Sequence, residues 1–192
     1  MSLSTRSDTT SRFAVGAAGG VGAYLLGYLL VYVTQRGSVE EQLAGFNFIA
    51  DLFGSDPIPS WQAVGWVFYN AHFVATEIPG FGGTRSENFI AAGDDGTLTA
   101  LYLVPIVLLL VAGLVAGRVA GADDPTDGAQ AGALVVVGYL PLAIVGAVVF
   151  GYSVGDGTVA PDLVTAVLLA GAVYPAALGA VGGVASTFLG GE

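Results

Sequence analysis

Four long apolar runs dominate the pattern of hydrophobic and polar positions along this chain. No charged residue occurs between Arg12 and Arg36, and three later intervals are also free of charge: those between Asp95 and Arg118, between Asp127 and Asp156, and between Asp162 and Glu192. Each interval is longer than the roughly 20 residues that a helix needs to cross the hydrocarbon of a bilayer. The pattern predicts four transmembrane helices behind a polar tail at residues 1–12, and places them at residues 13–33, 98–119, 129–150 and 163–189.

The segment between the first two runs, residues 34–97, mixes polar and apolar positions at helical spacing. One apolar face over residues 40–54 is formed by Leu43, Phe46, Ile49, Ala50 and Phe53. This face predicts an amphipathic helix that lies outside the four apolar runs.

A second amphipathic helix is expected at residues 61–77, in the stretch WVFYNAHFVATEIPG and just before it. Ser60 is a suitable N-cap after Pro59, and Pro79-Gly80 ends the helix. Its length of about 17 residues is near the lower limit for a membrane span. Trp and Tyr favour the membrane interface, and five polar residues interrupt the segment: Gln62, Asn70, His72, Thr76 and Glu77. We therefore favour a helix at, or dipping into, the outer membrane surface, with a fifth span as the alternative.

The arginines indicate which side of the membrane each end occupies. Arg6 and Arg12 precede the first run, so the N-terminus is expected in the cytoplasm. With four spans the C-terminus also lies in the cytoplasm. A fifth span would exchange the sides of Arg85 and Arg118 and leave the number of inner arginines unchanged, so charge does not decide between the two arrangements.

Composition supports the membrane assignment and excludes one class of partner. Of 192 residues, 54% are hydrophobic and 10% charged, with a mean hydropathy of +0.76, whereas soluble domains carry about 25% charged residues. Fifteen acidic residues face only five basic ones, all arginine, so the chain repels nucleic acid and we expect no binding to it. The acid excess without lysine is typical of the high-salt cytoplasm of a halophilic archaeon.

Small residues and prolines predict how the spans pack. Glycines four residues apart let helix backbones approach closely; they are Gly16 with Gly20, then Gly113, Gly117 and Gly121, and then Gly179 with Gly183. The expected fold is an all-α, polytopic membrane bundle with two extracytoplasmic interfacial helices, in contact with lipid and assembled as a homo- or hetero-oligomer. Pro105, Pro141 and Pro175 each follow a tyrosine within the spans and are expected to kink them. We favour ordinary kinks tolerated in lipid over hinges along a transport path.

Little in the chain indicates catalysis. The four runs lack the ionisable residues that mark proton or ion paths. Asn70, His72 and Glu77 form a candidate polar site only if their segment enters the bundle. A lone histidine without any cysteine is a poor zinc or haem ligand set, and the HExxH pattern is absent. We therefore expect no metal, no cofactor and no enzymatic activity.

One stretch carries a family resemblance. The run WQAVGWVFYNAHFV, followed by TEIPGFGG and set between the first span and a proline-containing second one, resembles small multi-pass membrane proteins encoded widely in haloarchaea. That group is functionally uncharacterised, and some of its members are loosely labelled transporters. The resemblance covers most of the chain. It implies a habitat and a topology class, and it supplies no catalytic residue.

Two functions are consistent with these features. The favoured one is a non-enzymatic scaffold or accessory subunit of a membrane complex, whose outer helices contact a partner or the lipid surface. The alternative is a small oligomeric transporter or channel that uses the polar residues of segment 61–77. A transporter requires a polar cavity near the middle of the bilayer, whereas a scaffold requires a dry bundle with an exposed apolar outer face.

Overall fold

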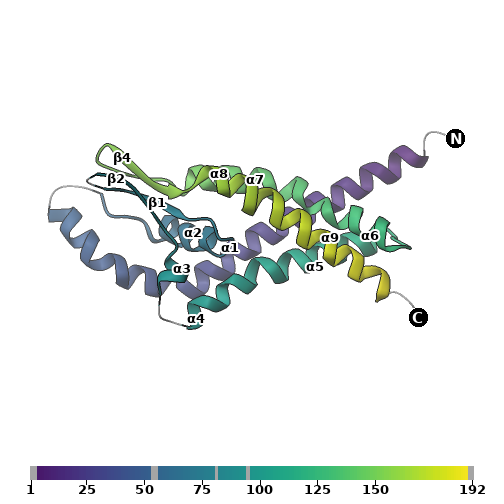
Figure 1. Ribbon diagram of the computed structural model, residues 1–192, viewed down its shortest axis with the longest axis horizontal. Helices are drawn as coiled ribbons and strands as arrows, with labels where there is room; N and C mark the ends of the chain where they lie inside the picture. The colour runs from purple at the N-terminus through teal and green to yellow at the C-terminus, as the bar shows by residue number, and fades with distance from the viewer. Residues whose placement is uncertain (1–3, 53–55, 81, 94–95, 190–192) are drawn as a thin grey trace.

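Long helices account for most of the molecule in the computed structural model, which describes residues 4–52, 56–80, 82–93 and 96–189. The long helices are α1 (Ser4–Leu52), α2 (Ser60–Asn70), α5 (Leu103–Val119), α6 (Pro125–Ala133), α7 (Val135–Val149) and α9 (Tyr174–Phe188). Shorter helical segments are α3 (Phe89–Ala92), α4 (Gly96–Thr99), η1 (Ala100–Tyr102), α8 (Leu163–Thr165) and the π-helical η2 (Ala166–Val173). Figure 1 shows α1 running the length of the molecule, with both chain termini at the end opposite the β-strands.

Among the described residues, four helical segments are long and apolar enough to cross a membrane. They are Thr10–Phe48, Ala100–Val119, Pro125–Val149 and Leu163–Phe188. This confirms the expectation of four such helices. The third begins four residues earlier than expected, because Asp124 caps α6 by accepting hydrogen bonds from two backbone N–H groups, and Pro125 occupies its first turn.

Close backbone contacts between glycines hold these helices together. A Cβ atom at Gly113 or Gly132 would overlap the carbonyl oxygen of Gly179, and one at Gly183 would overlap that of Gly128. These contacts join α9 to both α5 and α6, and a side chain there would force the backbones apart.

The other glycines singled out in the sequence lie in two different settings. Gly16 faces Leu134, Gly20 faces the backbone of α7, and Gly117 faces Ser186. Gly121 does not pack between helices: it has a φ of +63° in the turn after α5, and no atom lies within 4 Å of a Cβ built there. That left-handed backbone conformation explains why position 121 is a glycine.

The three prolines occupy different helical positions. Pro141 lies inside α7, Pro105 is the third residue of α5 directly after η1, and Pro175 is the second residue of α9 directly after η2. Because proline lacks an N–H group, it cannot complete the α-helical ladder at these points. Irregular helix therefore precedes two of the three prolines, as 3₁₀ turn and as π-helix.

Residues 40–52 of the amphipathic helix expected at residues 40–54 form the far part of α1, and Phe53 and Gly54 lie outside the described residues. The helix continues without a break because Gly37 alone costs only about 1 kcal/mol, and the Arg36 guanidinium donates to Glu40 one turn later at 2.7 Å. After Leu52 the chain returns beside α1, where the Asn47 side chain pairs with both backbone groups of Ile58 at 2.8 and 3.2 Å.

The all-α expectation is wrong in one respect, because four short strands form a sheet at one end of the bundle. They are β1 (Thr76–Gly80), β2 (Gly83–Glu87), β3 (Tyr152–Val154) and β4 (Gly157–Pro161), in the order β2-β1-β4-β3. β1 and β2 form one hairpin, between α2 and α3, and β3 and β4 form the other, between α7 and α8. The two hairpins join where β1 pairs with β4, with Thr76 opposite Pro161. Figure 1 shows both hairpins together, beyond the start of α8. We call this the sheet end.

The helix expected to run to Glu77 ends at Asn70. Backbone N–H groups of His72 and Phe73 bond to Tyr69 and Asn70 in a tight turn, and Phe73 has a φ of +59°. A left-handed residue cannot continue an α-helix. The remaining 11 residues of α2 span roughly 16 Å, too little for a fifth span.

A hydrogen bond across the sheet end joins two segments that a five-span arrangement would separate. The Tyr152 hydroxyl donates to the Asp56 carbonyl oxygen, so the segment before α2 lies beside the β3–β4 hairpin. Five spans would put these two segments on opposite sides of a membrane. Four spans put them on the same side.

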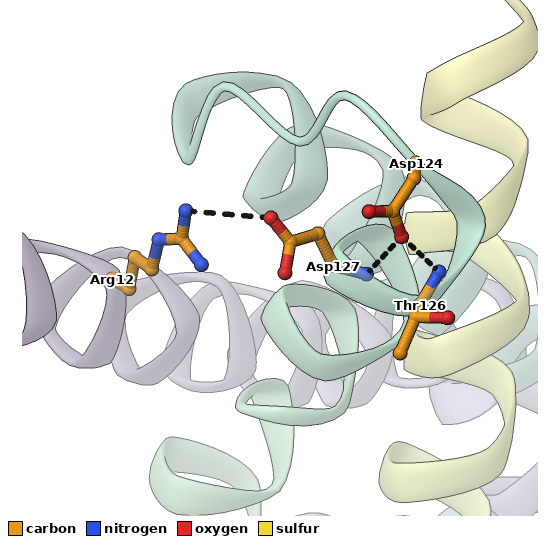
Figure 2. A network of polar contacts seen from close by, with 4 residues as sticks. All are labelled: Arg12, Asp124, Thr126 and Asp127. Atoms are coloured by element: carbon orange, nitrogen blue, oxygen red, sulfur yellow. Dashed lines mark hydrogen bonds and ion pairs between the residues drawn. The ribbon is translucent and has the colours of Figure 1, made fainter.

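Polar contacts close the opposite end of the bundle. Figure 2 shows Arg12 of α1 reaching toward Asp127 of α6, with 3.9 Å between the charged groups, while Asp124 caps the same helix. Arg118 donates to the Leu189 carbonyl oxygen at 3.0 Å and so joins the ends of α5 and α9.

Candidate functional site

The segment that contains the single histidine enters the helix bundle from the sheet end. Its contacts with the third span move steadily away from that end: Gln62 donates to Gly151, Trp66 to Phe150, Tyr69 to Ala143, and His72 meets Tyr139. Tyr139 lies ten residues before the end of α7 at Val149, which is about 15 Å along a helix. Segment 60–72 is therefore re-entrant: it goes in as helix α2 and comes back as the chain leading to β1.

His72 is fully buried and both of its ring nitrogens are hydrogen-bonded. Nδ1 lies 2.9 Å from the Phe68 carbonyl oxygen and Nε2 lies 2.6 Å from the Tyr139 hydroxyl. A carbonyl oxygen only accepts, so Nδ1 carries the proton. In the neutral ring Nε2 then accepts from Tyr139, and this arrangement satisfies both residues without a charge.

A second hydrogen-bonded pair lies beside the first. The Tyr69 hydroxyl donates to the Ala143 carbonyl oxygen, so the Tyr24 hydroxyl, 3.2 Å away, donates to Tyr69. Gly146 makes room for this pair, because a Cβ atom there would overlap the Tyr24 hydroxyl oxygen. Tyr24 comes from α1, Tyr69 from α2 and the acceptor Ala143 from α7, so the pair ties three helices together.

Aromatic rings enclose these hydroxyl groups. The Tyr24 ring meets Phe68 edge-on at 5.1 Å and Tyr139 at 5.2 Å between centroids, and the Tyr174 ring lies 5.7 Å from His72. Tyr24, Tyr69, His72 and Tyr139 are each at most 5% exposed. We call these four residues the His72 cluster.

Asn70 holds the turn that follows α2. Its side-chain N–H₂ donates to the Val74 carbonyl oxygen at 2.8 Å and to the Thr76 hydroxyl at 3.2 Å, and its side-chain oxygen accepts from the Phe89 N–H at 2.8 Å. Asn70 and Thr76 are fully buried. The amide therefore fixes the path from α2 into β1 and the start of α3.

Glu77 does not join this group. It lies in β1, where it pairs with Ser86 on one side and Ala160 on the other, and no hydrogen bond or ion pair links it to His72 or Asn70 in the part of the chain that the structure describes. The structure therefore does not bring Asn70, His72 and Glu77 together as one site. Asn70 and His72 are buried and hydrogen-bonded to other protein groups, whereas Glu77 lies in the sheet.

Sequence reasoning missed the partners of His72. Tyr24 lies on α1, Tyr69 on α2, and Tyr139 and Gly146 on α7, so no local sequence pattern groups them. One signal was present: Tyr24 and Tyr139 stand well inside their apolar runs, whereas tyrosine ordinarily gathers at the ends of spans.

The chemistry that this cluster supports is limited. Every polar side-chain atom that is fully buried among the described residues has a hydrogen-bond partner, so the cluster offers no free donor or acceptor to a substrate. No group of three His, Asp or Glu side chains in the described ranges is arranged to hold a metal ion. The arrangement is suited to anchoring the re-entrant segment.

Comparison with known families identifies a match over nearly the whole chain. The family model for the family of unknown function DUF7978 matches residues 2–190. No curated protein and no solved structure matches the chain.

Proposed function

The chain belongs to DUF7978, and we propose that it is a non-enzymatic integral membrane protein, a scaffold or accessory subunit of a membrane complex. Its task in this proposal is to hold a folded layer at the membrane surface. That layer consists of α3, the sheet and the far part of α1, and α2 anchors it in the bundle.

Membrane insertion is supported by where the apolar side chains lie. Leu25, Leu29, Val111 and Val148 are among many large hydrophobic residues of the candidate spans that are about half or more exposed, and water would penalise such a surface. We place the protein in the cell membrane with four spans. Arg6 and Arg12 favour cytoplasmic N- and C-termini, and the acid-rich composition favours a halophilic archaeal source.

The closed His72 cluster is the observation that carries the scaffold proposal. If the bundle lies in a bilayer with its sheet end at one surface, His72 lies between Tyr139, which is about 15 Å along α7 from that end, and the start of the second span, where the neighbouring Phe73 stacks on Tyr102 at 4.5 Å between ring centroids. There the cluster is dry and its hydrogen bonds are complete. A permeation site there requires water-accessible polar groups. A cluster that only anchors the segment requires polar groups that are buried and fully hydrogen-bonded, as those of the His72 cluster are.

The surface layer offers apolar side chains to a partner. On the far part of α1, Phe46 and Phe48 are 49% and 65% exposed. We propose that this part of α1 contacts another protein subunit, either a second copy or a different chain.

A small oligomeric transporter or channel is the second candidate. It is favoured by the π-helix η2 next to Pro175, because π-helical turns are frequent at functional sites, and by Tyr174, whose ring contacts His72 from the neighbouring helix α9. Permeation would require the His72 cluster to open.

Gentle extraction from native membrane tests the choice between the two candidates. The scaffold proposal expects a defined complex that is lost in Phe48→Ser, while Phe188→Ser, at an equally exposed phenylalanine on α9, retains it. Ion or solute flux through the purified protein in liposomes, reduced by His72→Gln, would instead favour the transporter and contradict the scaffold.

A further inference from the structure

A groove lies where α1 leaves the bundle at the sheet end. Gly27 of α1 faces Leu108 of α5, so Gln35, about two helical turns further along, is level with η1 at the start of the second span. The groove has two adjoining hollows of about 240 and 110 Å³, which share Val39, Gln42, Val67 and Phe89. It therefore opens at the boundary between the apolar spans and the polar outer layer.

Gln35 is a buried polar side chain that lines the larger hollow without a partner. It is 7% exposed, and its amide makes no hydrogen bond to any residue that the structure describes, whereas the fully buried polar side-chain atoms there are all satisfied. The Gln35 amide atoms therefore face the open hollow and not the sealed core. There they can pair with a donor or acceptor of a molecule in the groove.

The other lining residues define the chemistry of that molecule. Ser38 and Gln42 lie on the same face of α1 as Gln35 and add uncharged polar groups, while Val67, Phe89, Ile90 and Leu98 form apolar walls. No charged side chain lines either hollow among the described residues. The groove thus combines an amide, which both donates and accepts, with space for hydrocarbon.

We propose that this groove binds an uncharged membrane lipid, with its hydroxyl or ester group at Gln35 and its chain along Val67 and Phe89. The inference rests on the membrane placement proposed above and adds a specific lipid site to it. Anionic headgroups are disfavoured, because among the described residues the side of the protein that carries the groove holds eight acidic residues against two arginines.

The chain supplies its own reporter for the test. It has two tryptophans, and Trp66 lines the smaller hollow while Trp61 does not. A Trp61→Phe variant in phosphatidylcholine nanodiscs leaves Trp66 as the sole fluorophore. Dioleoylglycerol brominated on its acyl chains is the uncharged probe, and brominated phosphatidylglycerol is the anionic one.

We expect saturable quenching of Trp66 by brominated dioleoylglycerol and unsaturable, weak quenching by the anionic lipid. Gln35→Leu should raise the mole fraction of brominated dioleoylglycerol that gives half-maximal quenching about tenfold, because the variant loses one hydrogen bond to the lipid. Gln130→Leu, at an exposed glutamine on α6, is the matched control and should leave the curve unchanged.

A second variant covers the case in which Gln35→Leu does not fold. Ala92 also lines the larger hollow and is itself exposed, so Ala92→Phe fills the groove without disturbing the core and should abolish saturation. Quenching that is linear and equal in all variants would overturn the lipid site, as would a photo-crosslinker at Ser38 that captures protein instead of lipid. Neither outcome would contradict membrane insertion, which labelling of introduced cysteines tests separately.

Discussion

His72 and Tyr139 are hydrogen-bonded at 2.6 Å although 67 residues separate them in the chain. The bond joins a loop segment to the interior of the third span. Because the Phe68 carbonyl oxygen accepts from the other ring nitrogen, removing the Tyr139 hydroxyl leaves Nε2 buried without a partner.

Tyr139→Phe should therefore destabilise the protein by about 1–3 kcal/mol, the cost of an unsatisfied buried polar group. Thermal unfolding in detergent, followed by circular dichroism, measures the change. Tyr174→Phe is the control: its ring also contacts His72, but its hydroxyl has no hydrogen bond within the described residues, so little loss is expected. Equal stability of the two variants would contradict the role assigned to the His72–Tyr139 bond.

The second hydroxyl pair is tested through the glycine that makes room for it. Gly146→Ala places a methyl group on the Tyr24 hydroxyl oxygen and should cost about 1–3 kcal/mol through overpacking and the disrupted Tyr24–Tyr69 contact. Gly22→Ala is the control, since no atom lies within 4 Å of a Cβ there and alanine favours a helix by up to about 1 kcal/mol. The two substitutions should shift the unfolding temperature in opposite directions; a shift in the same direction would contradict this account.

The number of helices long and apolar enough to cross a membrane was predictable because the signal is local. An uninterrupted apolar run such as residues 98–119 indicates a span without reference to any other part of the chain. The cluster was not predictable in this way, because Tyr24, His72 and Tyr139 meet only after α1, α2 and α7 have packed. Helical spacing relates residues within one helix and says nothing about pairs 45 or 67 positions apart.

The strands escaped prediction for a related reason. Thr76–Gly80 contains Pro79 and is only five residues long, which gives a weak strand pattern. Its stability comes from pairing with Gly83–Glu87 and with β4, and the second of these partners lies in another loop. The helix ends before Thr76 partly for a local reason. The Asn70 side chain donates hydrogen bonds to Val74 and Thr76 and so favours a turn over a longer helix.

Asp162 is expected to stabilise the junction between the sheet and the fourth span. Its carboxylate accepts from the Thr165 hydroxyl at 2.6 Å and from the Thr165 N–H at 2.9 Å, and these bonds hold the pKa of Asp162 below its usual value. Its own backbone N–H donates to Ala75. Asp162→Ala removes the cap and should cost about 1 kcal/mol.

The lowered pKa adds a dependence on pH. A carboxyl group with a lower pKa in the folded state contributes stability above its unfolded-state pKa of 3.8, and this contribution is lost as the pH falls through the folded-state value. Asp162→Asn retains a side-chain acceptor and does not titrate. Unfolding temperatures measured from pH 6 down to the acid limit should therefore fall more steeply for the natural protein than for Asp162→Asn, and parallel curves would refute the assignment.

Membrane topology can be tested by cysteine labelling, because the chain contains no cysteine. Thr84 in β2 and Thr126 at the start of α6 are exposed at opposite ends of the bundle. With four spans and a cytoplasmic N-terminus, a membrane-impermeant maleimide added to intact cells should label Thr84→Cys and should reach Thr126→Cys only after permeabilisation. A five-span protein would give the reverse pattern, and equal accessibility of the two sites, with both or neither labelled in intact cells, would contradict insertion itself. The Tyr152–Asp56 contact favours four spans over five, because it requires the segment before α2 and the β3–β4 hairpin to share one side of the membrane, and Arg6 and Arg12 favour the orientation.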